Sequence, residues 1–222
     1  MNVYSNILLN HRSSMTTVSI NQRDGMTRQK TFLREDIIDK VIGVFMTKGY
    51  EGASVKDLVD ATGLHPGSLY NAFGNKQALY QAALERFDAM SPFNRLLDLA
   101  DTAPPRESIE QLLEGVVDPD LDSDGVAGCL LTYAAAEVGA TNKELAKSLH
   151  MSFQRMEDRL CRFIERGQEC GDFSSTRDPR DLAQFLLSTI QGIQVISKVT
   201  KEKAHFRAAA DVAIKALDQV RN

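Results

Sequence analysis

The sequence predicts an all-α protein with a small N-terminal helical unit and a larger C-terminal helical bundle, and three observations predict it. After residue 31, apolar residues recur every three or four positions, which is the period of helices buried on one face. Glycine, proline and asparagine stand where these periodic segments start and stop. No segment keeps the strict alternation of apolar and polar residues that indicates a half-buried strand.

Within the N-terminal unit, the first 30 residues show no periodicity and are rich in serine, threonine, asparagine and glutamine, so we expect a disordered arm at 1–30. Met26 is an alternative start of the chain. Helical periodicity begins at Phe32 and ends at Gly49, a typical glycine after a helix C-terminus. The apolar stripe that defines this helix consists of Leu33, Ile37, Val41 and Phe45.

Three shorter helices follow. Ser54 is a candidate N-cap for the second helix, and Gly63 ends it. The third helix spans about 66–73 and begins with a proline, which suits a first helical position. Asn75 caps the fourth helix, which runs to Met90 and stops before a proline.

The remaining segments predict a helical bundle over 92–222. Helices are expected over 109–117, 126–138, 142–169, 178–199 and 204–220. The second of these is apolar and rich in small residues, so we expect it to be buried on most sides.

Composition and charge restrict the class of protein. The chain has 222 residues, of which 43% are hydrophobic and 25% charged, as in ordinary globular proteins. It lacks a run of roughly 20 apolar residues and a signal peptide, so we expect a cytoplasmic protein that does not contact a membrane. Its three cysteines, Cys129, Cys161 and Cys170, form no C-x-x-C pair, which argues against a disulfide framework.

The net charge of −4 is unevenly distributed. Residues 1–76 hold nine Lys/Arg and seven Asp/Glu, a balance of +2, and the rest hold 17 and 23, a balance of −6. Phosphate binding requires a local basic face rather than a basic chain. We therefore expect a partner-binding unit at the N-terminus of an acidic body.

The second and third helices, at about 54–73, have the proportions of a helix-turn-helix, whose second helix enters the major groove of DNA. Gly63 permits the tight turn, and the small Gly67 and Ser68 allow close approach to the duplex. Tyr70 can donate its hydroxyl to a phosphate, and a lysine follows at the next helix start. The segment alone fits an ordinary packed corner equally well.

The spacing of the whole N-terminal unit favours DNA binding. Three elements follow one another: F-x-x-x-G-Y, S-V-x-D-L-x-x-A-T-G-L and G-S-L-Y-x-x-F-x-N-K-x-x-L. With them, the segment 31–91 closely resembles the N-terminal domain of TetR-family transcriptional regulators. The resemblance implies a homodimeric repressor whose two helix-turn-helix units read a palindromic operator on double-stranded DNA. It also implies that a small-molecule inducer binds the C-terminal body and releases the DNA.

The resemblance also implies roles for individual residues. The positions that match phosphate contacts are Ser54, Ser68, Tyr70 and Lys76. The positions that match contacts to base edges are His65, Pro66, Gly67 and Asn71. The chain departs from the family pattern at His65, where Ser or Thr is usual, and at Pro66, where Lys or Arg is common. Whether His65 caps its helix or contacts DNA is open at this stage.

In the body, the resemblance implies that the last two helices pair with those of a partner as a four-helix bundle, so we expect a homodimer through about 179–220. The candidate face consists of Leu182, Phe185, Leu186, Ile190, Ile193, Ile196, Ala213, Ile214 and Leu217. The alternative is that these stripes only build the core of a monomer.

Candidate ligand-binding residues come from the middle helices of the body, where one hydroxyl stands among apolar side chains. They are Phe93, Leu97, Leu112, Cys129, Tyr133, Phe153 and Met156. The alternative is plain core. Cys129 also suggests a repressor that senses electrophiles or oxidants through its thiol, although a buried cysteine among leucines is inert in most proteins.

An enzyme is not expected. The four histidines are scattered, and the sequence contains no HExxH, GxSxG or P-loop motif. The acidic stretch at 118–124 lacks the glutamate that closes an EF-hand loop, so we expect no metal and no cofactor. A second alternative to a repressor is a helical adaptor that kept the fold and lost DNA binding.

Overall fold

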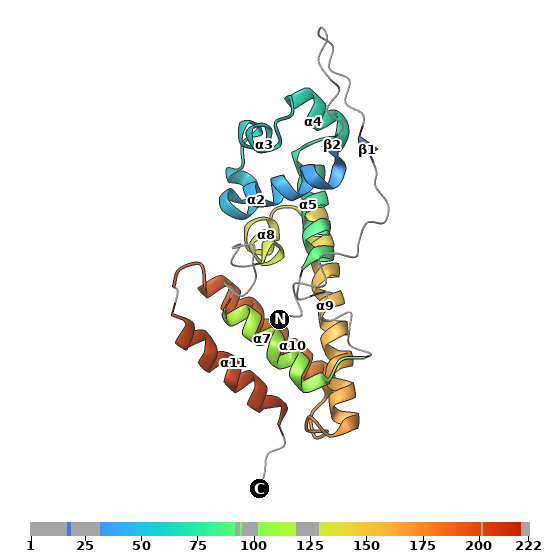
Figure 1. Cartoon of the computed structure of the whole chain (residues 1–222), viewed down its shortest axis with the longest axis vertical. Coiled ribbons are helices and arrows are strands. Elements are labelled where there is room, and N and C mark those ends of the chain that lie inside the picture. Colours follow the sequence, from blue (N-terminus) through green and yellow to red (C-terminus); the bar gives the residue numbers. More distant parts are fainter. Residues whose placement is uncertain are drawn as a thin grey trace. The chain divides into compact units, whose positions relative to one another are not determined.

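The computed structural model describes residues 17–18, 32–91, 94, 102–118, 129–200 and 202–218. Its described helices and strands fall into two compact units, with the division between Ala89 and Met90. Figure 1 shows the helices of each unit, which confirm the predicted all-α class. The predicted disordered arm lies, apart from Thr17 and Val18, outside the described residues.

The N-terminal unit contains one short ladder that the sequence did not predict. Strand β1 (Thr17–Val18) pairs antiparallel with β2 (Phe32–Leu33). Two residues are too short a segment to show an alternating pattern, which is why periodicity missed it. The first helix consequently starts at Arg34, two residues later than predicted.

Four helices build the N-terminal unit: α2 (Arg34–Gly52), α3 (Val55–Thr62), α4 (Pro66–Phe73) and α5 (Lys76–Met90). Helix α2 kinks where the sequence predicted its end, at Gly49, whose φ of 73° lies in the left-handed region that favours glycine. One further turn then reaches Gly52. The side chains that form the core of this unit are Ile37, Val41, Phe45, Leu58, Leu69, Leu79, Tyr80 and Leu84.

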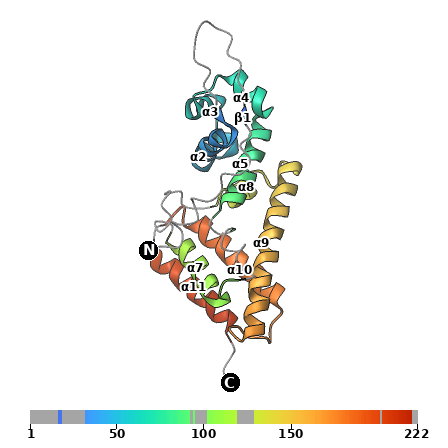
Figure 2. The same ribbon diagram turned by 45° about the vertical axis from the view of Figure 1, so that its right-hand side comes forward.

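Five helices build the body: α7 (Pro105–Val117), α8 (Leu130–Val138), α9 (Lys143–Cys170), α10 (Pro179–Ile196) and α11 (Lys203–Leu217). Figure 2 shows α9 as the longest of them, and α10 packs along it. Helix α7 contacts α9, α10 and α11, so the core of the body lies among these four helices.

Capping contacts fix several helix ends in the body. The Asn142 side chain caps α9, which ends at Gly171 with a φ of 85°. The Asp178 side chain accepts a hydrogen bond from the Arg180 N–H at the start of α10. Helix α7 begins earlier than predicted, at Pro105, because proline is favoured at the first helical position.

The predicted dimer face is wrong for most of its residues. Six of the nine are buried inside their own chain: Leu182, Leu186, Ile190, Ile193, Ala213 and Leu217. A helix in an oligomer can have two apolar faces, and the periodicity identified the face that packs inward. Other apolar side chains on α10, just after it and on α11 are exposed. They are Phe185, Val195, Ile196, Val199 and Val212.

Candidate nucleic-acid interface

Helix α3 begins with a complete capping box. The Ser54 hydroxyl oxygen accepts from the Asp57 backbone N–H at 3.2 Å, and the Asp57 carboxylate accepts from the Ser54 N–H at 2.9 Å. The same carboxylate accepts from the Ser54 hydroxyl at 2.7 Å and pairs with the Lys48 ammonium at 2.5 Å. The Lys48 ammonium, followed by the Ser54 donors, holds the Asp57 pKa far below its usual range. Ser54 therefore fixes the start of α3 before any DNA is bound.

The turn between α3 and α4 has the predicted geometry. Gly63 has a φ of 70°, and its N–H donates to the Val59 carbonyl at 2.8 Å. Thr62 is buried, and its hydroxyl donates to the Leu58 carbonyl at 2.7 Å. Leu64, 3% exposed, fills the space beneath the turn. These contacts fix the direction in which α4 leaves the turn.

His65 caps α4. Its backbone is extended, and its Nδ1 accepts from the Gly67 N–H at 3.4 Å, with Pro66 at the first helical position. A neutral imidazole that accepts at Nδ1 carries its proton on Nε2. The ring is exposed, so capping leaves Nε2–H available as a donor to a base or a phosphate.

The remaining α4 residues divide into a buried and an outward face. Leu69 and Phe73 are buried and hold the helix to the unit. Gly67 and Asn71 are exposed, one helical turn apart, and Ser68 lies between them and is half-buried. The outward face at the N-terminal end of α4 therefore combines small side chains with one amide that can donate and accept hydrogen bonds.

Lys76 makes two contacts that the sequence did not reveal. Its ammonium lies 4.8 Å from the ring centroid of Tyr50, and its Nζ donates to the Glu51 carbonyl at 3.4 Å. A second cation, the Arg34 guanidinium, lies 4.7 Å from the ring centroid of Phe73. No local sequence pattern indicates a contact between residues so far apart in the chain. The only sequence signal is that Tyr50 belongs to the G-Y element.

In the body, the predicted pocket residues are only partly brought together. Cys129 precedes α8 and is buried, and Tyr133 is half-buried on α8. Leu112 and Met156 are buried on α7 and α9, and Phe153 is half-buried. The two remaining predictions, Phe93 and Leu97, lie outside the described residues.

A polar layer connects α8 to the C-terminal end of α10. The Tyr133 hydroxyl donates to the Gln194 carbonyl at 3.4 Å, and the Thr132 hydroxyl donates to the Gln191 and Gln194 side chains. The Lys198 ammonium lies 3.1 Å from the Tyr133 ring centroid. Burial raises the pKa of Tyr133 to about 12, and burial lowers the pKa of Lys198. Sequence reasoning missed Lys198.

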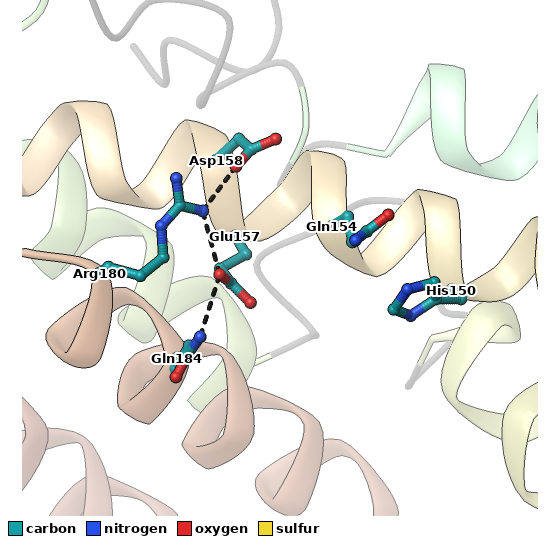
Figure 3. Close-up of a pocket in the computed structure, with 6 residues that line it drawn as sticks. All are labelled: His150, Gln154, Glu157, Asp158, Arg180 and Gln184. Atoms are coloured by element: carbon teal, nitrogen blue, oxygen red, sulfur yellow. Dashed lines mark hydrogen bonds and ion pairs between the residues drawn. The ribbon is translucent and has the colours of Figure 1, made fainter.

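A separate cleft of about 430 Å³ lies between α9 and α10 (Figure 3). It is lined by His150, Gln154, Glu157, Asp158, Arg180 and Gln184, none of which was a predicted pocket residue.

The polar groups at one end of this cleft bind one another. The Arg180 guanidinium pairs with Glu157 at 3.0 Å and with Asp158 at 2.5 Å, and the Gln184 amide donates to Glu157 at 3.2 Å. The cleft thus joins two helices by ion pairs and lacks the apolar walls of a typical ligand pocket. In the part of the chain that the structure describes, no three His, Cys, Asp or Glu side chains are grouped to hold a metal ion.

Comparisons with known proteins agree with this geometry. A model of bacterial regulatory proteins of the tetR family matches residues 37–83, and a model of tetracyclin repressor-like C-terminal domains matches residues 106–213. The chain belongs to the TetR family. It is a DNA-binding transcriptional regulator and not an enzyme.

Its relatives are similar over most of their length. The HTH-type transcriptional repressor ComR of Escherichia coli is 27% identical over 172 residues, 77% of this chain and 82% of ComR. The repressor DhaR of a Mycobacterium species is 26% identical over 190 residues, 85% of this chain and 93% of DhaR.

Among solved structures, a cysteine mutant of the TetR-family regulator CifR, complexed with 26-base-pair operator DNA, superposes with a TM-score of 0.74. That match has 29% identity and covers 85% of this chain and 99% of the CifR chain. None of the described helices is long and apolar enough to cross a membrane.

Proposed function

We propose that this regulator is a cytoplasmic homodimeric repressor that binds a palindromic operator through α4 and is released by a small-molecule inducer bound in the body. The observation that carries the proposal is the outward face of α4, capped by His65, with small residues at its N-terminus and a cation at the next helix start. The names of ComR and DhaR as repressors and the operator complex of CifR support it.

Two sets of residues are proposed to contact DNA, one at the phosphates and one at the base edges. Contacts to phosphates are assigned to Ser68, Tyr70 and Lys76, and to Ser54, whose hydroxyl would exchange its bond to the Asp57 carboxylate for a phosphate oxygen. Contacts to base edges in the major groove are assigned to His65, Pro66, Gly67 and Asn71. Phosphate contacts fix orientation without reading sequence, whereas base contacts discriminate by about 1–3 kcal/mol each. In a dimer, two copies of α4 would read half-sites about 34–36 Å apart.

The outward faces of α10 and α11 are the surfaces we propose for dimerisation. Val195, Ile196 and Val199 are exposed at the C-terminal end of α10 and just beyond it, and Val212 is 61% exposed on α11. A methyl group added at Gly192 would meet nothing within 4 Å, so a partner helix could approach α10 closely there. Exposed apolar groups of this kind favour burial against a second copy.

The inducer site is proposed around Tyr133 and Lys198, where a hydroxyl and an ammonium stand beside buried apolar residues. A ligand would weaken operator binding if it favoured a body conformation in which the two α4 helices no longer match the half-site spacing. The loss equals the difference in the ligand's affinity for this conformation and for the DNA-binding one, about 1–3 kcal/mol.

The proposal is tested by incubating the purified chain with fragments of its own genome and sequencing what it retains at physiological salt. We expect recovery of fragments that share one palindromic sequence, and a dimer by sedimentation at micromolar concentration. Fragments without a common sequence, or none at all, would favour the helical adaptor that has lost DNA binding. A monomer at that concentration would contradict the homodimer.

A second candidate function is control through the Cys129 thiol. The observation that favours it is the position of Cys129 one helical turn before Tyr133, whose backbone N–H donates to the Cys129 carbonyl at 3.1 Å and whose ring holds the Lys198 ammonium. The other buried cysteine, Cys161, is held inert by burial and by Glu165, which raise its pKa to about 11.

The Cys129 thiolate would attack one oxygen of hydrogen peroxide, so that the O–O bond breaks and a sulfenic acid forms; the other oxygen leaves as hydroxide and takes up a proton from solvent to become water. We expect peroxide to release DNA from the wild type and from Cys170→Ser but not from Cys129→Ser. Equal release from Cys129→Ser would exclude this mechanism.

A further inference from the structure

We infer that Tyr50 is a positioning residue for DNA binding: its ring holds the Lys76 ammonium in place for a backbone phosphate. The inference rests on the proposed function, because it concerns how one of the proposed phosphate contacts is prepared. It adds a residue to which no role in recognition has been assigned here.

The contact joins the C-terminal end of α2 to the start of α5. Tyr50 lies just after the kink of α2, and Lys76 is the first residue of α5. The left-handed backbone at Gly49 redirects the chain at this point. The ammonium then lies 4.8 Å from the Tyr50 ring centroid and donates to the Glu51 carbonyl at 3.4 Å. Because an ammonium has three N–H donors, these two contacts leave it able to donate to a phosphate.

The ring that holds the ammonium is itself fixed by the core. The ring centroids of Tyr50 and Tyr80 lie 4.9 Å apart, and the Tyr80 side chain is 1% exposed. Tyr80 in turn makes an edge-to-face contact with the buried Phe45, at 4.6 Å between centroids. Three aromatic rings in contact therefore connect the core to the Lys76 ammonium. The fold of the unit thus sets the position of the ammonium.

The kind of partner that Lys76 has decides what it can bind. Lys48 pairs with the Asp57 carboxylate, and Lys56 pairs with Asp60, so each of these cations already has an anionic partner. An aromatic face and a carbonyl attract a cation without cancelling its charge. Lys76 is therefore held in place and still carries a full positive charge toward an anionic partner.

Holding the Lys76 side chain in place before DNA binds reduces the entropy that it loses on binding. A free lysine side chain has many rotamers and loses most of them when it binds a phosphate. Because the Lys76 ammonium already lies on the Tyr50 ring, part of that loss has occurred during folding. Removing the ring should therefore weaken DNA binding even though the charge remains.

The first test uses a random-sequence duplex, because phosphate contacts do not depend on the operator. Lys76→Ala should lower the slope of log K against log salt by about 0.9 for each subunit bound. Tyr50→Leu should weaken binding about two- to fivefold, and Tyr50→Phe, which keeps a ring, should remain within about twofold of the wild type. Lys56→Ala, which removes an already paired charge, should change the slope less than Lys76→Ala.

The double variant decides whether the ring acts through the lysine. Tyr50→Leu should cause almost no further loss in a Lys76→Ala background, because the group that the ring positions is gone. The same fold loss in both backgrounds would overturn the inference.

The second test needs no DNA, so it separates a failure of this inference from a failure of the proposed function. In the NMR spectrum of the wild type, the Lys76 Hε protons should be shifted upfield by the ring current of Tyr50. Tyr50→Phe should keep that shift. Unshifted protons in the wild type would overturn the inference even if Tyr50→Leu proved too unstable to study. A shifted signal in a chain that binds no duplex would instead contradict the proposed function alone.

Discussion

The N-terminal unit and the body can be compared through the partners of their cationic side chains. In the N-terminal unit, Lys76 and Arg34 lie on aromatic rings, whereas Lys48, Lys56 and Arg86 pair with carboxylates. In the body, Arg180 and Arg207 pair with carboxylates of neighbouring helices, and Arg106 pairs with Asp218 and also lies over the Phe173 ring.

The comparison teaches that a cation on a ring keeps its charge for an external anion, whereas a cation on a carboxylate serves the fold. In the body, the Lys198 ammonium lies on the Tyr133 ring. That contact falls at the proposed inducer site.

The largest expected effect distinguishes the inner and outer faces of α10. Ile193 is 4% exposed, so Ile193→Asp places a carboxylate in the core and should destabilise the body by about 4 kcal/mol or more. Ile196 is 41% exposed, so Ile196→Asp should leave the helical content intact and produce monomers. Circular dichroism and sedimentation measure the two outcomes. A folded Ile193→Asp, or an Ile196→Asp that still dimerises, would contradict these assignments.

A smaller effect compares a crowded glycine in the body with an open one in the N-terminal unit. A methyl group at Gly167 would lie 2.0 Å from Cδ2 of the buried Phe173, so Gly167→Ala should cost about 1–3 kcal/mol. The same change at Gly43, where the methyl meets nothing within 4 Å, should stabilise α2 by up to about 1 kcal/mol. Urea denaturation measures both. Equal effects would show that packing around Gly167 is looser than described.

The Asp57 cap should give the N-terminal unit a characteristic response to acid. Because the folded-state pKa of Asp57 lies below its unfolded value of about 3.9, its contribution to stability is complete above that value and is lost as pH falls further. The difference in urea midpoint between the wild type and Asp57→Asn should therefore be constant from about pH 5 to 7 and shrink below about pH 4. A difference that grew in acid would contradict the capping box.

The smallest effect on the free protein is expected at Tyr133. Its hydroxyl donates a long hydrogen bond to the Gln194 carbonyl, and loss of such a bond is a small effect, so Tyr133→Phe should change stability and ligand-free operator affinity by less than about 1 kcal/mol. The response to inducer should change, because the hydroxyl is proposed to face the ligand. Operator titrations with and without inducer measure both quantities. Loss of ligand-free DNA binding would make Tyr133 a core residue.

The sequence predicted the N-terminal unit more completely than the body, for physical reasons. Its helix caps, such as Ser54 and Asn75, act on their own neighbours, so local patterns locate them. The role of His65 was open, because one ring nitrogen can cap while the other remains free.

Long-range contacts were not predictable from local patterns. The Tyr50–Lys76 and Tyr133–Lys198 contacts join segments that are far apart in the chain, and nothing in the local sequence indicates them. The predicted face at Ile193 and its neighbours was wrong because periodicity shows that a helix has an apolar stripe but not whether its own chain or a partner covers it.

The most direct test of the central claim compares two substitutions on the operator selected from a pool of random duplexes. Asn71→Ala should alter the preferred sequence, at about 1–3 kcal/mol per lost base contact, and leave the salt slope unchanged. Lys76→Ala should keep the preference and lower the slope. If the wild type selected no palindrome, or if both substitutions had the same effect, α4 would not read DNA as proposed.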